Sequence, residues 1–304
     1  MTAKTVRKIA AAKKAAVRWT LFVFFLGVSL VFVMPTVLTL TNSLMSQSEI
    51  AANYGQVFSS VAGDAKVFVA GQTNLKLIPD MVTFSQYDNV LLRNPQYLIK
   101  FWNSMILTLP IVAGQILIAL LASYGFARFE GKLRSILFFT YVILMLMPYQ
   151  VTLVPNYLVS EWLGLLDTRA AIILPGIFSP FAVFILTKFM RRIPTAMIEA
   201  AKLDGASEIK IFTRVCLPMS QSIVYSVAIL VFIDYWNMVE QPLVLMKKAE
   251  TLHPLSVFLS QINAGDAALA FAVASIYMVI PLLVFLYSED YIIEGVSYSG
   301  GVKG

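Results

Sequence analysis

The polar residues of this chain that are best suited to chemistry lie within or beside long apolar segments. Asp234, Trp236 and Asn237 stand together at the end of one such segment. Carboxylates and amides bind hydroxyl groups, aromatic rings stack on the faces of sugars, and polar groups at membrane depth often face a solute pathway. The three residues therefore suit the binding of a polyhydroxylated solute. Asn103 and Gln115 offer the same chemistry from another apolar segment.

A structural interpretation of these polar residues is equally open at this point. Tryptophan is common in the aromatic belts at membrane–water interfaces, and Asp234 could pair with a neighbouring helix. Asn103 and Gln115 could likewise join helices to one another. The sequence predicts a possible translocation path through these five positions without choosing between the two roles.

The motifs of catalysis are absent from the sequence. The nearest match to a phosphate-binding P-loop, Gly125 with Gly131-Lys132, is one residue too long and has Leu133 where Ser or Thr is required. Histidine, cysteine and acidic residues form no cluster with the spacing of metal ligands. We therefore expect no catalytic residue, no metal and no cofactor bound by this chain.

The single histidine and the single cysteine are both expected to be structural. His253, next to Pro254, is predicted to lie on the surface of a loop. Cys216 is predicted to be a small buried apolar residue, and one cysteine cannot form an intramolecular disulfide.

The composition indicates an integral membrane protein. Of the 304 residues, 59% are hydrophobic and 13% are charged, whereas soluble domains carry roughly 25% charged residues. The apolar residues form blocks near the roughly 20 residues that cross a bilayer as a helix. The net charge of +6 arises from basic residues at the ends of these blocks, where lipid and topology account for them, so we expect no nucleic-acid partner.

Six apolar segments are predicted to be transmembrane helices, which makes the fold all-α. The first covers residues 19–40. We interpret it as a retained helix and not as a cleaved signal peptide, because it is too long for a signal-peptide core and no small-x-small cleavage site follows it. The predicted organisation is a cytoplasmic tail over 1–18, that first helix, an extracytoplasmic loop over 41–102, a five-helix core over 103–290 and a tail over 291–304. Within the core, the later helices are expected at 103–127, 135–154, 170–190, 219–236 and 267–287.

Prolines and an amphipathic piece modify this plan. Pro148, Pro155, Pro175 and Pro180 are expected to kink their helices, since neighbouring groups in a bundle can satisfy the freed carbonyls. Residues 157–166 are amphipathic and are expected to lie along the outer interface.

The distribution of Lys and Arg predicts the orientation. The N-terminal tail has six, the turn after the second segment has three, and the stretch from Lys188 to Arg214 has six. The short loops on the other side have one and two. Positive residues stay in the cytoplasm, so both termini and the polar loop over 191–218 are predicted to be cytoplasmic.

That polar loop is predicted to form two short helices. Pro194 suits the first turn of a helix, and Asp204-Gly205 supplies a stop because glycine accepts the left-handed conformation. Ser207 is a plausible cap for a second helix, and Pro218 can open the fifth span. Met197, Ala200 and Ala201 share a small apolar face on the first helix, and Glu199 adds one charge for a basic partner residue. An ordinary loop helix lying on lipid headgroups is the alternative.

The loop resembles a known signature. Glu199-Ala-Ala201, three residues, Gly205, nine residues, Val215 and Leu217-Pro218 are similar to the motif of permease subunits of bacterial ABC importers, with Val215 where Ile is usual. The chain also resembles the smaller permease of carbohydrate importers of the maltose type. The features that carry this resemblance are the six spans, the segment from Phe101 to Ser104, Trp236-Asn237 and the terminal Gly-Val-Lys-Gly.

The resemblance implies a transport role without catalysis. It implies a bacterial cell-membrane location and alternating access driven by two ATPase subunits, which would bind ATP and Mg. A second, different permease and an extracytoplasmic sugar-binding protein, docking on the 41–102 loop, are the other implied partners. The tail from Glu289 to Gly304 would be a second ATPase contact, although Tyr298 and Ser299 stand where small residues are usual. The residues implied to couple to the ATPase are Glu199, Ala200, Ala201, Asp204, Gly205, Leu217 and Pro218.

Three alternatives remain for the function. An importer for a non-sugar solute, such as a peptide or phosphonate, would share the same signature. An ion-gradient carrier would need an inverted repeat and half-helices at mid-membrane, which the sequence does not reveal. A membrane-bound enzyme would need clustered carboxylates or histidines near one interface, and no such cluster is present.

Overall fold

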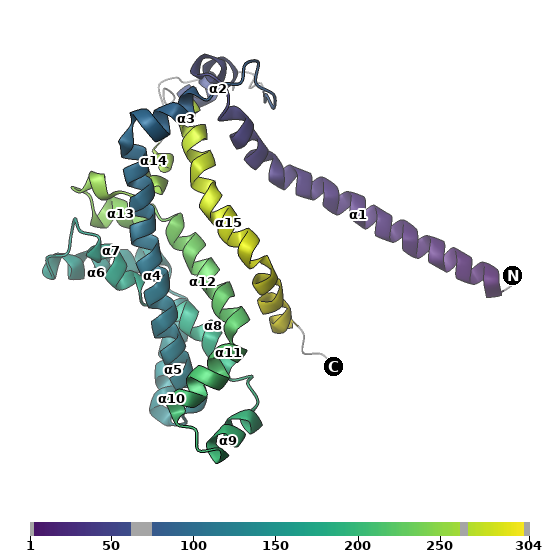
Figure 1. Cartoon of the computed structure of the whole chain (residues 1–304), viewed down its shortest axis with the longest axis vertical. Coiled ribbons are helices and arrows are strands. Elements are labelled where there is room, and N and C mark those ends of the chain that lie inside the picture. Colours follow the sequence, from purple (N-terminus) through teal and green to yellow (C-terminus); the bar gives the residue numbers. More distant parts are fainter. Residues whose placement is uncertain (1–2, 62–74, 262–266, 301–304) are drawn as a thin grey trace. The chain divides into compact units, whose positions relative to one another are not determined.

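A computed structural model describes residues 3–61, 75–261 and 267–300, and within them every regular element is a helix (Figure 1). The chain divides into two compact units. The first comprises Met1–Arg93 with Ile262–Ser275, and the second comprises Asn94–Gln261 with Ile276–Gly304. Residues 62–74 of the predicted 41–102 loop lie outside the described residues.

The first unit begins with a long apolar helix. Helix α1 covers Ala3–Asn42, and from Lys13 to Thr36 its side chains are all exposed, although most are apolar. An apolar surface of this length is suited to lipid rather than to water. Helices α2 (Gln47–Val61) and α3 (Ser85–Asp88), the π-helix η1 (Asn89–Arg93) and the start of α15 (Ala267–Gly300) complete the unit.

A small core and a polar cluster hold the first unit together. Met45, Ile50 and Tyr54 pack against Ala267 and Ala268.

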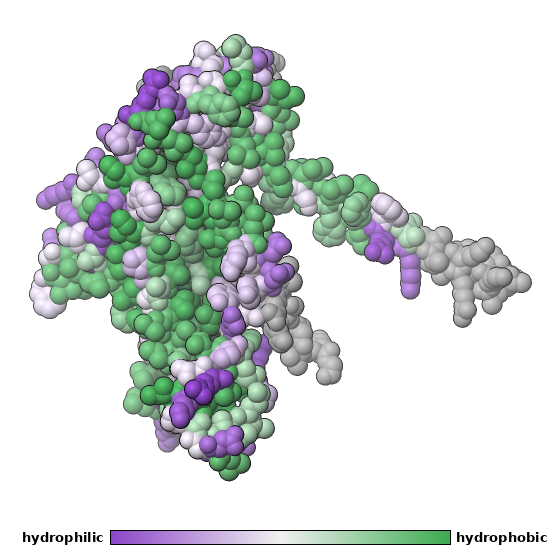
Figure 2. All heavy atoms as spheres, in the orientation of Figure 1, coloured by the Kyte–Doolittle hydropathy of each residue, from purple (hydrophilic) through white to green (hydrophobic). Residues whose placement is uncertain are grey.

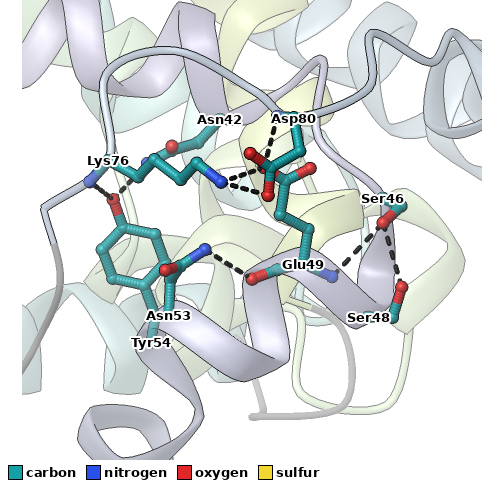
Figure 3. Close-up of polar contacts among 8 residues, drawn as sticks. All are labelled: Asn42, Ser46, Ser48, Glu49, Asn53, Tyr54, Lys76 and Asp80. Atoms are coloured by element: carbon teal, nitrogen blue, oxygen red, sulfur yellow. Dashed lines mark hydrogen bonds and ion pairs between the residues drawn. The ribbon is translucent and has the colours of Figure 1, made fainter.

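Glu49 of α2 is the centre of the polar cluster, because its Oε1 accepts the Asp80 backbone N–H at 2.8 Å and pairs with Lys76 Nζ at 3.1 Å (Figure 3). The hydrogen bond to Asp80, followed by the one to Glu49, raises the pKa of Lys76 above 10.5. The contribution of Lys76 to folding stability is therefore present below the ordinary lysine pKa, and it is lost as pH rises through the raised pKa.

The second unit contains the other helices. They are α4 (Pro95–Arg128), α5 (Lys132–Met145), α6 (Tyr149–Trp162), α7 (Ala170–Gly176), α8 (Pro180–Met190), α9 (Thr195–Leu203), α10 (Glu208–Ile211), η2 (Phe212–Cys216), α11 (Leu217–Met219), α12 (Gln221–Trp236), α13 (Glu240–Leu245), η3 (Glu250–Leu252), α14 (Leu255–Ser260) and the rest of α15. Hydrophobic residues cover much of the long helices, and the end that carries α9 and α10 shows hydrophilic residues beside hydrophobic ones (Figure 2).

The core of the second unit lies where α4 packs against α8 and α12. Small residues bring the backbones close together. A Cβ added to Gly114 would lie 2.5 Å from Ile177 Cγ2, and one added to Gly176 would lie 3.1 Å from Ile111. Glycines at these two positions therefore allow α4 to contact the junction of α7 and α8 directly.

Four described helices are long and apolar enough to cross a membrane, and two bent helix pairs would raise that number to six. One pair is α5 with α6, bent by 105°, and the other joins Glu208–Met219 to α12 with a bend of 74°. The segment predicted to cross at 135–154 therefore turns after Met145, and α6 begins at Tyr149, directly after Pro148.

The segment predicted at 170–190 is interrupted, not merely kinked. Helix α7 ends at Gly176 and α8 begins at Pro180. Proline lacks an N–H and disfavours helical backbone in the residue before it, and Ser179 is extended, with φ −129° and ψ 113°. Ser179 Oγ then accepts the Ala182 N–H at 3.3 Å and caps the new helix. The break covers residues 177–179, and Ala170–Met190 as a whole is still one of the four candidate spans.

Candidate translocation path and the 191–218 loop

The 191–218 loop contains the predicted helix, stop and second helix. Helix α9 begins at Thr195. Pro194 is therefore the cap residue and lies just before the first turn, in which it was predicted. At its end, Gly205 has φ +75°. The Gly205 N–H bonds Lys202 O and the Ala206 N–H bonds Ala201 O, both at 3.0 Å, which is a Schellman arrangement. Ser207 precedes α10 as its cap residue but makes no side-chain cap bond.

The two faces of α9 are divided differently from the prediction. Ile198 is buried and Ala201 is half-buried against the main core, so Ala201 faces inward. Glu199 and Ala200 are exposed. Leu203 at the tip of the loop is 90% exposed, which is unusual for a leucine and was not singled out from the sequence. The face open to another protein is thus polar at its centre and apolar at its tip.

Aliphatic side chains anchor the loop in the core of the second unit. Ile193, Ile198, Ile211 and Cys216 are buried in the same cluster as residues of α4, α8 and α12. Cys216 is 0% exposed, which confirms its prediction as a buried apolar residue. Because the loop shares a core with these helices, it cannot be displaced without repacking them.

A polar contact adds to this anchoring. The Tyr124 hydroxyl of α4 donates to Glu208 Oε2 of α10 at 2.5 Å, and Glu208 Oε1 pairs with Lys202 Nζ of α9 at 2.9 Å. One carboxylate therefore links both helices of the loop to α4. Neither Tyr124 nor Glu208 was singled out from the sequence, because their separation of 84 residues leaves no local signal.

The end of the loop differs slightly from the prediction. Leu217 is half-buried against the core cluster, whereas Asp204 and Pro218 are exposed. Pro218 lies within the three-residue helix α11, and α12 begins only at Gln221 after the bend. Pro218 thus precedes the fifth apolar helix by three residues.

A cavity of about 570 Å³ lies beside the interruption between α7 and α8. Gln115 of α4 and Tyr235 of α12 reach the interruption, where Gln115 Nε2 donates to Gly176 O at 2.6 Å and the Tyr235 hydroxyl donates to the same carbonyl at 3.4 Å. A helix end leaves its last carbonyls without partners, so these two side chains satisfy a group that the interruption exposes. Both residues line the cavity.

Asp234 also lines the cavity, from α12. Its side chain is exposed, and no ion-pair partner for it exists among the described residues. The predicted pairing of Asp234 to a neighbouring helix is therefore not found there. Gln115 and Asp234 are the two predicted path residues that the structure brings together.

The other three predicted path residues lie elsewhere. Asn103 is 2% exposed, donates to Thr251 O at 2.8 Å and accepts from Arg169 Nη2 at 2.8 Å, so it fixes the segment before α14. Trp236 is fully buried between the stacked rings of Phe232 and Tyr277.

Asn237 is exposed, and its Nδ2 donates to Ile233 O at 2.8 Å within its own helix end. None of these three side chains lines the cavity. Hydrogen bonds hold Asn103, ring packing holds Trp236, and Asn237 bonds its own helix end.

The prediction of a surface histidine is wrong. His253 is 6% exposed, and its Nε2 lies 2.8 Å from Met246 O. The backbone around it is held by Asn103 and by Ser104, whose Oγ accepts the Leu255 N–H at 3.0 Å. The polar residues that follow Phe101 thus hold a segment 150 positions away, which a local pattern cannot reveal.

Comparison with known proteins identifies the family. Residues 93–294 match the model of the family described as binding-protein-dependent transport system inner membrane component. The chain belongs to this family. The prediction of a permease of this type is confirmed, and the protein is a multi-pass membrane component of a transport system.

Relatives and a solved structure agree with the assignment of this inner membrane component. It is 27% identical to the arabinooligosaccharides transport system permease protein AraQ of Bacillus subtilis, over 94% of this chain and 96% of the relative. It is 33% identical to the osmoprotective compounds uptake permease protein GgtD of Synechocystis, over 67% and 70% of the two chains.

A chain from the crystal structure of a bacterial ABC transporter involved in the import of the acidic polysaccharide alginate has the same fold. Its TM-score is 0.68 at 20% identity, covering 95% of this chain and 98% of that one.

Proposed function

We propose that this inner membrane component is the permease subunit of an ATP-driven importer for a sugar or oligosaccharide. It would form half of the translocation path and pair with a second permease. Two ATPase subunits would bind ATP and Mg, and an extracytoplasmic binding protein would deliver the solute. Six spans, a cytoplasmic 191–218 loop and cytoplasmic termini are part of the proposal.

The observation that carries the coupling part is the exposed face of α9. Glu199 and Ala200 point away from a helix whose other face is buried in the core with α4, α8 and α12. A small, charged surface attached rigidly to apolar helices is suited to passing a displacement from a partner to those helices. Gly205 holds the second half of the loop at a fixed angle by its left-handed backbone.

The sugar part is supported by chemistry and by a relative. Gln115 and Asp234 place hydrogen-bonding groups in a cavity that aromatic side chains also line, and the permease AraQ is named for arabinooligosaccharides. A non-sugar solute is the alternative, since GgtD is named for osmoprotective compounds. The cavity supports the first assignment because its polar groups suit hydroxyls.

The test is solute-stimulated ATP hydrolysis by the reconstituted transporter. Glu199→Lys combined with Gly205→Pro should abolish the stimulation while the complex still inserts in the membrane. Glu161→Gln, an exposed carboxylate on α6, is the matched control and should leave stimulation unchanged. Normal stimulation in the double variant would refute the coupling role of α9. Stimulation by non-sugar solutes alone would refute the assignment of a sugar as the transported solute.

A further inference from the structure

Gln115 lines the cavity and carries an unpaired, buried hydrogen-bond acceptor. Its side chain is 2% exposed, and Nε2 is occupied by the carbonyl of Gly176 at 2.6 Å. Oε1 has no hydrogen-bond partner within the described residues. Because the bond to a carbonyl fixes which end of the amide is the nitrogen, the unpaired atom is an acceptor. A buried acceptor of this kind needs a donor, which is either a hydroxyl that enters the cavity or an ordered water.

Asp234 gives the same cavity a negative charge without a compensating cation. No Lys, Arg or His is among the described residues that line it. The N-terminus of α8 contributes the opposite sign at the cavity, but a helix end is equivalent to about half a charge. Ser179 Oγ also already accepts one of its N–H groups. The carboxylate therefore dominates the potential in the cavity.

The remaining lining suits a flat solute with apolar faces. Tyr149, Phe178, Phe181 and Tyr235 line the cavity together with aliphatic residues. Its volume of about 570 Å³ falls within the roughly 300–1,000 Å³ of small-molecule sites. Gln115 lies well inside α4, and the cavity adjoins the break between α7 and α8.

We infer that this cavity is a subsite for an uncharged, hydroxyl-rich solute and that it rejects anionic solutes. Gln115 Oε1 and the Asp234 carboxylate accept protons of solute hydroxyls, and the aromatic side chains contact the faces between them. A carboxylate- or phosphate-bearing sugar meets Asp234, and the described lining has no basic residue to balance it. The inference rests on the proposed function and adds a substrate class to it.

The charge of the cavity is measured with a cysteine reporter. Thr152→Cys in a Cys216→Ser background places one thiol of this chain at the wall of the cavity. The variant is assembled with its partners in nanodiscs. A cationic methanethiosulfonate should react about tenfold faster than an anionic one, relative to their rates with free cysteine. Asp234→Asn should remove most of this preference, whereas Glu161→Gln should not change it. Equal rates in the parent, or an equal effect of both variants, would overturn the inference.

The ligand is tested by protection of the same thiol. Arabinotriose, a neutral probe, should slow the labelling at least fivefold, and trigalacturonate, an anionic probe, should not slow it. Gln115→Leu should abolish the protection while leaving the charge preference intact, and Asp234→Asn should weaken it. If Gln115→Leu fails to assemble, Asp234→Asn decides alone. Protection by trigalacturonate, or by neither probe, would contradict the inference.

Uptake by the complete transporter separates this inference from the proposed function. Arabinotriose uptake without charge preference in the cavity would overturn the subsite and leave the importer standing. Charge preference and protection without uptake or ATPase stimulation by any saccharide would overturn the proposed function and leave the subsite.

Discussion

Tyr124→Phe removes one hydroxyl group at the contact between α4 and the 191–218 loop. The aromatic ring is retained, so its contact with Phe212, at 5.2 Å between centroids, persists. What is lost is the 2.5 Å hydrogen bond to Glu208. Bonds to charged groups contribute about 1.5–3 kcal/mol. The Glu208 side chain is 45% exposed, so water competes and the lower end, about 1.5 kcal/mol, is expected.

A loss of that size corresponds to about a tenfold change in the local opening equilibrium. Hydrogen exchange of backbone amides over 195–216 in the assembled transporter measures it directly. Tyr124→Phe and Glu208→Gln should each reduce protection about tenfold, and the double variant should add little to either. Solute imported per ATP should fall with them, because a loosely held loop transmits less of its displacement.

Two controls accompany this cycle. Within the described residues, Tyr225→Phe removes a hydroxyl that accepts from the neutral Gln221 amide, and it should leave the exchange over 195–216 unchanged. Lys202→Met removes an ion pair whose side chains are 55% and 45% exposed, which contributes about 0.2–1 kcal/mol. Additive effects of Tyr124→Phe and Glu208→Gln would refute the reasoning, as would a larger effect from Lys202→Met.

The remaining predictions concern backbone and packing. Gly205→Ala forces a residue with a Cβ into φ +75° and should destabilise the loop by about 1–2 kcal/mol, measured by hydrogen exchange, with Gly205→Asn costing less; equal stability of both would contradict this. Gly114→Ala should cost about 1–3 kcal/mol in thermal unfolding by overpacking, since its Cβ would lie 2.5 Å from Ile177 Cγ2. Ile177→Ala in the same chain should recover part of the loss, and no recovery would mean another cause. Trp236→Ala should cost about 3–5 kcal/mol and Trp236→Phe much less, because its Nε1 has no partner to lose within the described residues; similar losses would show a role beyond packing.

The 191–218 loop shows how far a local pattern reaches. The stop at Asp204-Gly205 could be predicted because it depends on the φ angle of one residue type. The inward face of α9 could not be predicted in detail, since Ala201 is half-buried by residues that α4, α8 and α12 supply. Small alanines carry no signal of which side a partner will cover.

The apolar helices show the same division. Pro175 and Pro180 indicated distorted helix geometry around 170–190, but the interruption also needs Gln115 and Tyr235 to satisfy the Gly176 carbonyl. Those two side chains come from helices 61 and 59 residues away from Gly176. No periodicity within one segment records such a pairing.

By itself the sequence determined the membrane class, the helical fold, the apolar segments and the family, because each depends on composition or on residues close together in the chain. Only the tertiary structure decided which polar residues of those segments share a cavity. Gln115 and Asp234 meet at the interruption of one helix, while Trp236 and Asn103 are occupied by packing and hydrogen bonds elsewhere. The physical reason is that a polar side chain in a bundle is assigned its role by its partners, and these partners come from distant helices.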